Sequence, residues 1–426
     1  MNKLTRALLP LVLAFVLVGI LLFSPLLPVP QYTMNELKTF AHSPQLNSVF
    51  VGNEVKSKAF SSNKFLPILG SSELEKFDSF HPSSYFTKYN HGFTPFLAGQ
   101  PGTQSLTQFF YVNSVASELK NKKAVFIISP QWFVKQGLEP GAFTNFVSKG
   151  EIYSWIEKAN PEDSTTQEMA KRLLKMPDLT SDLTMKAALN SLSHGRPVNP
   201  LVYAIASSSV QIWKRQDSLF SGFTTYDSEK GDKNLNLSNF TKSLPNDENP
   251  NDLQEIAYAQ GEKAANNNQF NVNNQVWTKN LSKGYEKRQG QMSNVSYLQS
   301  PEYADFQQLL NEFAKNNMDV QFVIQPVNGA WYSYAGLSEQ TLQAFATKIT
   351  YQLRTQGFTN IVDLTDKYNE LYYIGDTIHF GTRGWLTVDQ NIEQFMKDKQ
   401  KSDYYMNNDL FLSQKWQNDT DLSPMN

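Results

Sequence analysis

Three residues with the chemistry of a serine acyl-transfer site occur in two short motifs of this chain. Ser72 ends the motif Gly70-Ser71-Ser72, while Asp376 and His379 stand three residues apart in Gly375-Asp376-Thr377-Ile378-His379-Phe380-Gly381. A carboxylate at that spacing reaches the imidazole Nδ1 and leaves Nε2 free to take a serine proton. The serine can then attack a carbonyl carbon, so this residue set predicts acyl transfer or ester hydrolysis. In the alternative interpretation, Asp376 shapes a turn and His379 packs against Trp385.

The position of Ser72 favours it as the nucleophile. The apolar run 65–69 predicts a buried strand, and a helical pattern begins directly after Ser72. A sharp strand-to-helix turn exposes a serine Oγ and aims free backbone N–H groups at an oxyanion. Two alternatives stay open. Ser71 is the rival nucleophile, and Ser72 could simply cap the helix, since Ser72-Glu73-Leu74-Glu75 fits a capping box.

Five short apolar runs alternate with helical patterns and predict a mostly parallel, doubly wound α/β sheet. The runs are 65–69, 93–98, 124–128, 320–324 and 360–364. Ligands of such sheets bind outside the carboxyl ends of the strands. Those ends are followed in turn by Ser72, Gly99, Gln131, Asn328 and the loop with Asp376 and His379. We therefore expect all of these residues on one rim of the sheet.

The sequence pattern does not decide which groups form the oxyanion hole. The backbone N–H groups of Ser72 and Gly99 and the side-chain amide of Gln131 are candidate donors. Ser71 and Asn328 are further candidates for substrate binding on the same rim. An alternative role for Gln131 is a hydrogen bond to loop backbone.

Residues from about 140 to 300 interrupt the strand and helix alternation. They show several helical patterns, and two stretches, 216–252 and 266–294, are rich in Asn, Gln, Asp, Ser or Lys and predict exposed loops. We interpret the block as a large helical insertion in the α/β domain. A separate second domain is the alternative.

The N-terminal region predicts a membrane anchor. Residues 7–29 carry no charge and are long enough to cross roughly 30 Å of hydrocarbon as one helix. Lys3 and Arg6 precede the segment, which favours a cytoplasmic N-terminus and an extracellular domain. A cleaved signal peptide is the alternative, but no Ala-x-Ala site follows. We expect residues 1–30 to form the anchor, 31–60 a stalk and 61–426 the extracytoplasmic domain.

Composition excludes several classes of function. The 426 residues hold 38 basic and 40 acidic side chains, so charge gives no indication of nucleic-acid binding. The chain has no cysteine, which excludes thiolate catalysis, thiolate metal sites and disulfides. No two of its five histidines have metal-ligand spacing. We expect neither a metal ion nor a cofactor.

The motifs carry a resemblance to known families. Gly70-Ser71-Ser72 with Asp-x-x-His is similar to the pattern of SGNH (GDSL-type) hydrolases, whose sheet is flavodoxin-like. Four ordered segments resemble the DltD family more closely: 69–74, 127–133, 326–332 and 375–381. The sequence departs from the SGNH pattern because Ser71 replaces the usual Asp and no Asn corresponds to the oxyanion residue.

The resemblance implies a function in the cell wall of Gram-positive bacteria. It implies a single-pass cell-membrane protein that esterifies (lipo)teichoic acid with D-alanine, alongside the membrane acyltransferase DltB and a D-alanyl donor. By position, Ser72 would be the nucleophile, His379 the base and Asp376 its orienting carboxylate. The alternatives are an SGNH-type esterase or thioesterase, and a non-catalytic membrane scaffold for D-alanylation.

Overall fold

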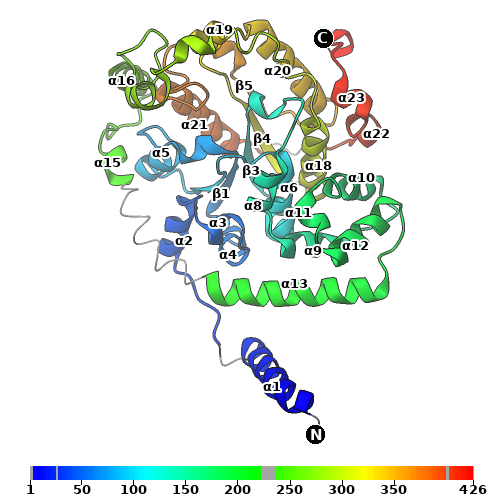
Figure 1. Ribbon diagram of the computed structural model, residues 1–426. Helices are drawn as coiled ribbons and strands as arrows, with labels where there is room; N and C mark the ends of the chain where they lie inside the picture. Colours follow the sequence, from blue (N-terminus) through cyan, green and yellow to red (C-terminus); the bar gives the residue numbers. More distant parts are fainter. Residues whose placement is uncertain (1–2, 25–26, 222–236, 400–402, 426) are drawn as a thin grey trace.

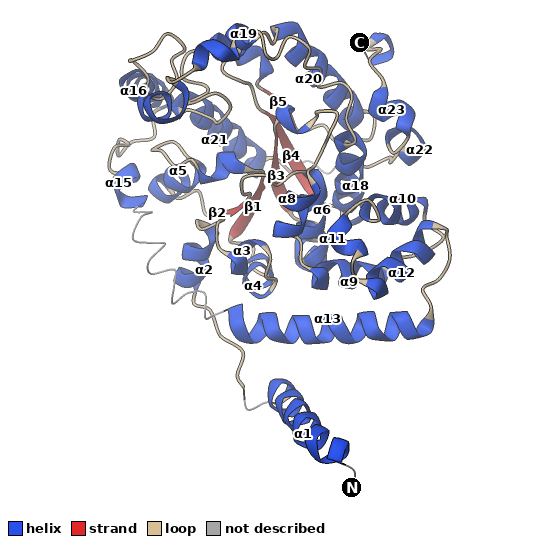
Figure 2. Ribbon diagram, viewed as in Figure 1, coloured by secondary structure: helices blue, strands red, loops and turns tan. Residues whose placement is uncertain are grey.

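The centre of the protein is one parallel sheet of five strands in the order β2-β1-β3-β4-β5 (Figures 1 and 2). The computed structural model describes residues 3–24, 27–221, 237–399 and 403–425. The strands are β1 (Phe65–Leu69), β2 (Thr94–Ala98), β3 (Lys123–Ile128), β4 (Asp319–Ile324) and β5 (Ile361–Asp363). This is the strand order of flavodoxin-like doubly wound sheets. The predicted α/β class and five-stranded parallel sheet are confirmed.

Helices cover both faces of the sheet, which explains why its strands are continuous apolar runs. Successive residues of β3 point to opposite faces. Phe126 packs in the core formed with α6 (Ser105–Ser114), α18 (Glu302–Lys315) and α20 (Glu339–Arg354). Its neighbours Val125 and Ile127 pack in the core formed with α5 (Pro82–Tyr89), α16 (Pro250–Ala264) and α21 (Thr382–Lys397).

The remaining helices lie around this centre, except α1, which stands apart from it (Figure 1). Before the sheet lie α1 (Lys3–Phe23), α2 (Met34–Ala41), α3 (Asn47–Phe50) and α4 (Glu54–Phe60). After β3 come α8 (Pro140–Phe146), α9 (Lys149–Lys158), α10 (Ser164–Leu173), α11 (Pro177–Thr180), α12 (Leu183–Ser193), α13 (Pro200–Phe220), α15 (Leu237–Thr241) and α17 (Asn274–Val276). Shorter elements include α7 (Ala116–Leu119), α19 (Gly329–Ala335), α22 (Asn408–Phe411), α23 (Gln414–Asn418) and the 3-10 turns η1 (Ser72–Glu75) and η2 (Pro130–Trp132).

The described part of the block from 140 to 300 holds helices and no strand, and its last segment, 265–300, consists mostly of turns and short helical pieces. The prediction that residues 216–252 and 266–294 form exposed loops is wrong in part. They include α15, the start of α16 and α17, and they bury Leu244, Phe270 and Val272. Single apolar residues set far apart among Asn and Gln give no periodic signal, yet each reaches the core. Residues 222–236 of the first stretch lie outside the described residues.

In the segment 31–60, expected to form a stalk, residues 34–60 make α2, α3 and α4. Their side chains Phe40, Val49, Phe50 and Phe60 are almost fully buried in the same core as β1 and α6. This segment is therefore packed as part of the α/β body.

The first helix, α1, stands apart from the sheet in Figure 1, and its side chains Leu8, Leu11 and Leu17 are about half-exposed. Within the described ranges, no helix combines the length and the apolar character that a membrane crossing needs. The anchor over residues 7–29 stays a prediction.

A buried ion pair joins α4 to α9 and generates a stability prediction. Lys56 Nζ lies 3.4 Å from Glu151 Oε1, with both side chains almost fully buried. Lys56→Met should destabilise the fold by about 3–5 kcal/mol, because it leaves the Glu151 carboxylate buried without its cation. Urea unfolding of the purified chain measures this change.

The matched control for this prediction is Lys58→Met, two residues along the same helix. Lys58 is 47% exposed and lies 3.7 Å from Glu54, so its loss should cost below about 1 kcal/mol. Equal effects of the two substitutions would contradict a special role for the buried pair.

Candidate active site

Ser72 lies at the carboxyl end of β1, on the first residue of the 3-10 turn η1. Its Oγ lies 2.8 Å from Nε2 of His379, which is 307 residues away in the sequence. The turn has no side-chain cap hydrogen bond, and it is 3-10 instead of α-helical. Ser72 therefore faces the histidine and does not serve as a helix cap.

The second ring nitrogen of His379 contacts Asp376. His379 Nδ1 lies 2.6 Å from Asp376 Oδ2, while Asp376 Oδ1 accepts the backbone N–H groups of Ile378 and His379 at 2.9 Å each. Burial by itself would raise the pKa of Asp376, but these hydrogen bonds and the nearby imidazole outweigh it and lower that pKa. The ionised carboxylate thus keeps the imidazole proton on Nδ1, and Nε2 can accept the serine proton.

The loop that carries Asp376 and His379 is held by two amides. Asn328 donates from its Nδ2 to the carbonyls of Phe270 and Asp376, and its N–H donates to Thr377. Gln325 Nε2 donates to the Ile378 carbonyl at 3.2 Å. Both side-chain N–H groups of Asn328 are occupied, so Asn328 supports the loop and offers no donor to an oxyanion.

The turn before Ser72 is fixed through one carbonyl. The Gly70 oxygen accepts hydrogen bonds from Gln108 Nε2 at 2.7 Å and from Thr103 Oγ1 at 2.8 Å. A Cβ on Gly99 would lie only 2.7 Å from the Gly70 carbonyl carbon and 2.8 Å from the Ser71 nitrogen. Gly99 therefore permits close contact between β2 and the turn.

Ser71 is not placed as a nucleophile. Its side chain is buried, and its hydroxyl donates to the Gln100 carbonyl at 3.1 Å. Its N–H donates to Glu73 Oε1 at 2.5 Å. The capping box between Ser72 and Glu75 does not form, and the Glu73 carboxylate instead accepts the backbone N–H of Ser71. Burial raises the pKa of Glu73, although the Ser71 N–H and the charge of His379 oppose this shift.

Gln131 lies in η2, after β3, and is partly exposed. Since β3 neighbours β1 in the sheet, Gln131 is on the same rim as Ser72. The sequence signals missed the supporting residues Gln108, Thr103, Gln325 and Glu73. The two glutamines have a visible signal, a polar residue within or directly after an apolar helical or strand pattern, whereas Thr103 and Glu73 have none.

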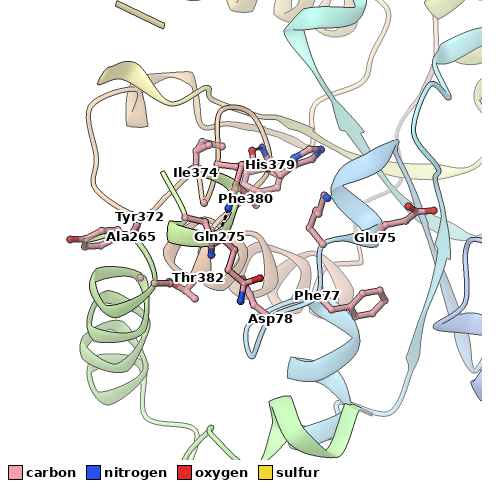
Figure 3. A pocket seen from close by; sticks show the side chains of 18 residues that line it. Glu75, Phe77, Asp78, Ala265, Gln275, Tyr372, Ile374, His379, Phe380 and Thr382 are labelled. Carbon is pink, nitrogen blue, oxygen red and sulfur yellow. Dashed lines mark hydrogen bonds and ion pairs between the residues drawn. The ribbon is translucent and has the colours of Figure 1, made fainter. Parts of the chain in front are cut away.

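A cavity of about 400 Å³ opens beside the histidine. Figure 3 shows its wall, which includes Asp78 from the segment after η1, Ala265 after α16, and Tyr372 and His379 from the loop before α21. The helical insertion therefore contributes one side of the space next to the reactive groups.

One group among the described residues has the atoms to hold a metal ion: His91, Glu248 and Glu393. His91 Nε2 lies 2.9 Å from Glu248 Oε1 and 3.5 Å from Glu393 Oε1. The Tyr85 hydroxyl contacts both carboxylates, at 2.6 and 2.8 Å. Protein partners thus already satisfy this group.

The fold and this geometry define a class: an α/β protein with a serine–histidine–aspartate chain of hydrogen bonds at the carboxyl edge of its sheet. Such a chain can raise the nucleophilicity of the serine for acyl chemistry.

The comparisons with known proteins then place the chain in a particular family. The family model "DltD protein" matches residues 43–397. Protein DltD of Lacticaseibacillus rhamnosus is 35% identical over 414 residues, 97% of this chain and 96% of that protein. Protein DltD of Bacillus subtilis (strain 168) is 32% identical, over 91% of this chain and 96% of that protein. The chain belongs to the DltD family.

A buried carboxyl group on α21 generates a pH prediction. Asp389 is fully buried, and neither of its carboxyl oxygens has a hydrogen-bond partner among the described residues. Burial, and then the charges of Asp78, Glu393 and Glu248, raise its pKa well above 3.8. The folded state therefore binds a proton that the unfolded state loses, and stability should fall as the pH rises above about 4.

The test is Asp389→Asn, which cannot ionise. We expect the free energy of unfolding in urea to fall less between pH 4 and 8 for this variant than for the parent. Asp366→Asn is the control, because that side chain is 62% exposed. Parallel pH profiles for the parent and Asp389→Asn would contradict the prediction.

Proposed function

We propose that this protein is a serine acyltransferase that esterifies hydroxyl groups of (lipo)teichoic acid with D-alanine through a seryl ester on Ser72. Membership of the DltD family supports a role in the D-alanylation pathway. The observation that carries the enzymatic proposal is the 2.8 Å contact between Ser72 Oγ and His379 Nε2. A scaffold that used Ser72 only as a helix cap would not need this contact.

In the first step, His379 Nε2 takes the Ser72 proton while Oγ bonds to the carbonyl carbon of a D-alanyl ester. The bond to the leaving oxygen breaks, and that oxygen receives the proton from His379. Asp376 stabilises the imidazolium formed in between. The product is D-alanyl-Ser72 and a free alcohol of the donor.

In the second step, a hydroxyl of the acceptor polymer replaces the donor alcohol. His379 takes the hydroxyl proton, the acceptor oxygen bonds to the carbonyl carbon, and the bond to Ser72 Oγ breaks. The proton returns to Ser72. The candidate donors to the oxyanion of both steps are the backbone N–H groups of Ser72 and Gly99 and the side-chain amide of Gln131.

The proposed setting is the outer face of the cell membrane. Residues 7–29 would anchor the chain, with residues 3 and 6 on the cytoplasmic side, and the domain would meet DltB and the D-alanyl donor of the pathway. The uncharged stretch and the exposed leucines of α1 support this. Confinement to one membrane raises the effective concentration of enzyme, donor and lipid-linked acceptor.

An esterase is the second candidate, because the same three residues would serve hydrolysis. Water would then replace the polymer hydroxyl in the second step. The sequence departures at Ser71 and at the oxyanion residue favour transfer over rapid hydrolysis.

Ser72→Ala tests the nucleophile in cells. At equal protein level, D-alanyl esters on teichoic acid should fall to background, because loss of a nucleophile costs on the order of 10³-fold or more in rate. Ser71→Ala is the matched control. The Ser71 hydroxyl contacts only the backbone carbonyl of Gln100, so its removal should lower the stability by about 1 kcal/mol. D-alanyl esters should therefore persist in Ser71→Ala. Unchanged esters in Ser72→Ala would overturn the proposal.

Asp376→Asn tests the orienting carboxylate, and the turnover of the parent chain in the same assay separates transfer from hydrolysis. Acylation of Ser72 in the purified chain by a small acyl ester, followed by intact-mass spectrometry, should slow by about 10⁴-fold, because the amide favours the wrong imidazole tautomer. Asp366→Asn should acylate at the parent rate. A rate unaffected by Asp376→Asn would exclude this role. Rapid turnover of the parent without an acceptor would indicate an esterase.

A further inference from the structure

Helix α13 (Pro200–Phe220) has an unusual surface for its place in the fold. It is 21 residues long and lies at the edge of the domain nearest α1 (Figure 1). The structure describes all of its residues, and of these Ala206, Val210 and Leu219 are buried. Most of the helix thus faces outward.

An apolar stripe runs along the outward face. Leu201 is 70% exposed, Ile205 and Ile212 are 45% exposed and Phe220 is 51% exposed. Their spacings of four, seven and eight residues put them on one side of the helix. A helix that faces water ordinarily carries charged residues there, and this stripe carries none. We call these four residues the outer stripe.

Two serine hydroxyls near the outer stripe are satisfied inside the helix, while Gln216 is the exposed polar residue of this face. Ser208 Oγ donates to the Ala204 carbonyl at 2.8 Å, and Ser209 Oγ donates to the Ile205 carbonyl at 2.9 Å. Serines that bond the preceding turn in this way need no water. The surface therefore suits contact with an apolar phase.

The outer stripe itself carries no charge. Asp217 is the one acidic residue of α13, and it points inward, where it accepts the N–H groups of Asn53 and Glu54 at 2.7 and 2.8 Å. At about 100° per residue, Arg215 lies at the border of the stripe and Lys214 lies on the opposite side of the helix. A face without carboxylates does not repel anionic headgroups.

Two contacts tie α13 to the end of α1. The Arg215 guanidinium donates to the carbonyls of Leu22, Ser24 and Leu27, which is favourable for a cation at a helix C-terminus. The Tyr32 hydroxyl lies 2.7 Å from Ser221 Oγ, just after α13. The helix is thus held where the chain leaves its N-terminal apolar segment.

We infer that α13 lies flat on the outer leaflet as an interfacial helix, with the outer stripe at the boundary between headgroups and acyl chains. The inference rests on the proposed anchoring by residues 7–29. Asp217 binds the start of α4, and β1 begins five residues after α4 ends. The amino edge of the sheet therefore faces the bilayer, and the edge with Ser72 faces away from it.

Site-directed fluorescence tests this placement cleanly, because the chain has no cysteine. Single cysteines replace Ile205 or Ile212 in the full chain, with Leu13→Cys in α1 and Gln340→Cys in α20 as references. Each is labelled with nitrobenzoxadiazole and reconstituted in nanodiscs of phosphatidylcholine and phosphatidylglycerol that contain nitroxide lipid. We expect quenching at Leu13, Ile205 and Ile212 at least about twofold stronger than at Gln340, since interfacial helices sit ~5–10 Å deep.

The pattern of quenching separates this inference from the anchor. Quenching at Leu13 without quenching at Ile205 and Ile212 would overturn the interfacial helix and leave the anchor standing. No quenching at any position would overturn both. Protection of the α13 labels only after a membrane protein is added would overturn the lipid contact and assign the outer stripe to a protein partner.

Discussion

The hydrogen bond between Ser72 and His379 depends on the direction of a parallel sheet. In a parallel sheet every strand ends at the same edge, so the residues after β1 and the loop after β5 share one rim although hundreds of residues separate them. β3 and β4 lie between those two strands and set the distance that the loop must cover. A change of strand order would separate the serine from the histidine without altering either motif.

The rim is held in place by amide side chains that have no role in the proposed reaction. Gln108 holds the carbonyl of Gly70, and Asn328 and Gln325 hold the loop with His379. Each amide donates to a backbone carbonyl of the rim, and a buried carbonyl left without any partner costs about 1–3 kcal/mol. Such fixed partners hold Ser72 and His379 in place, and the acyl transfer proposed for this site would require this preorganisation.

The helical insertion has two separate relations to this centre. At one end α16 and the residues after it form part of the cavity wall beside His379. At the other end α13 packs on α9 and binds the start of α4 through Asp217. One stretch of chain thus contributes both to the reactive edge and to the opposite edge of the body, which gives a physical reason for an insertion of this size.

Much of this arrangement could be predicted from the sequence because it is local. The five strands are short apolar runs, and the candidate site residues follow strand ends. The sequence did not predict the buried Phe270 and Val272, because isolated apolar residues in polar surroundings have no period. It did not predict the helices of residues 34–60 because each has at most eight residues, too few for a clear helical period. It also gave Ser72 two interpretations, cap or nucleophile, since both use the same local pattern.

The sequence by itself determined the α/β class, the family motifs and the small set of residues that could react. The tertiary structure alone decided which serine meets the histidine, that Asn328 supports the loop instead of facing an oxyanion, and that Glu73 binds the Ser71 N–H. The physical reason is that hydrogen bonds act over about 3 Å. Motifs fix residue types and local turns, whereas contacts at that range depend on how distant segments pack.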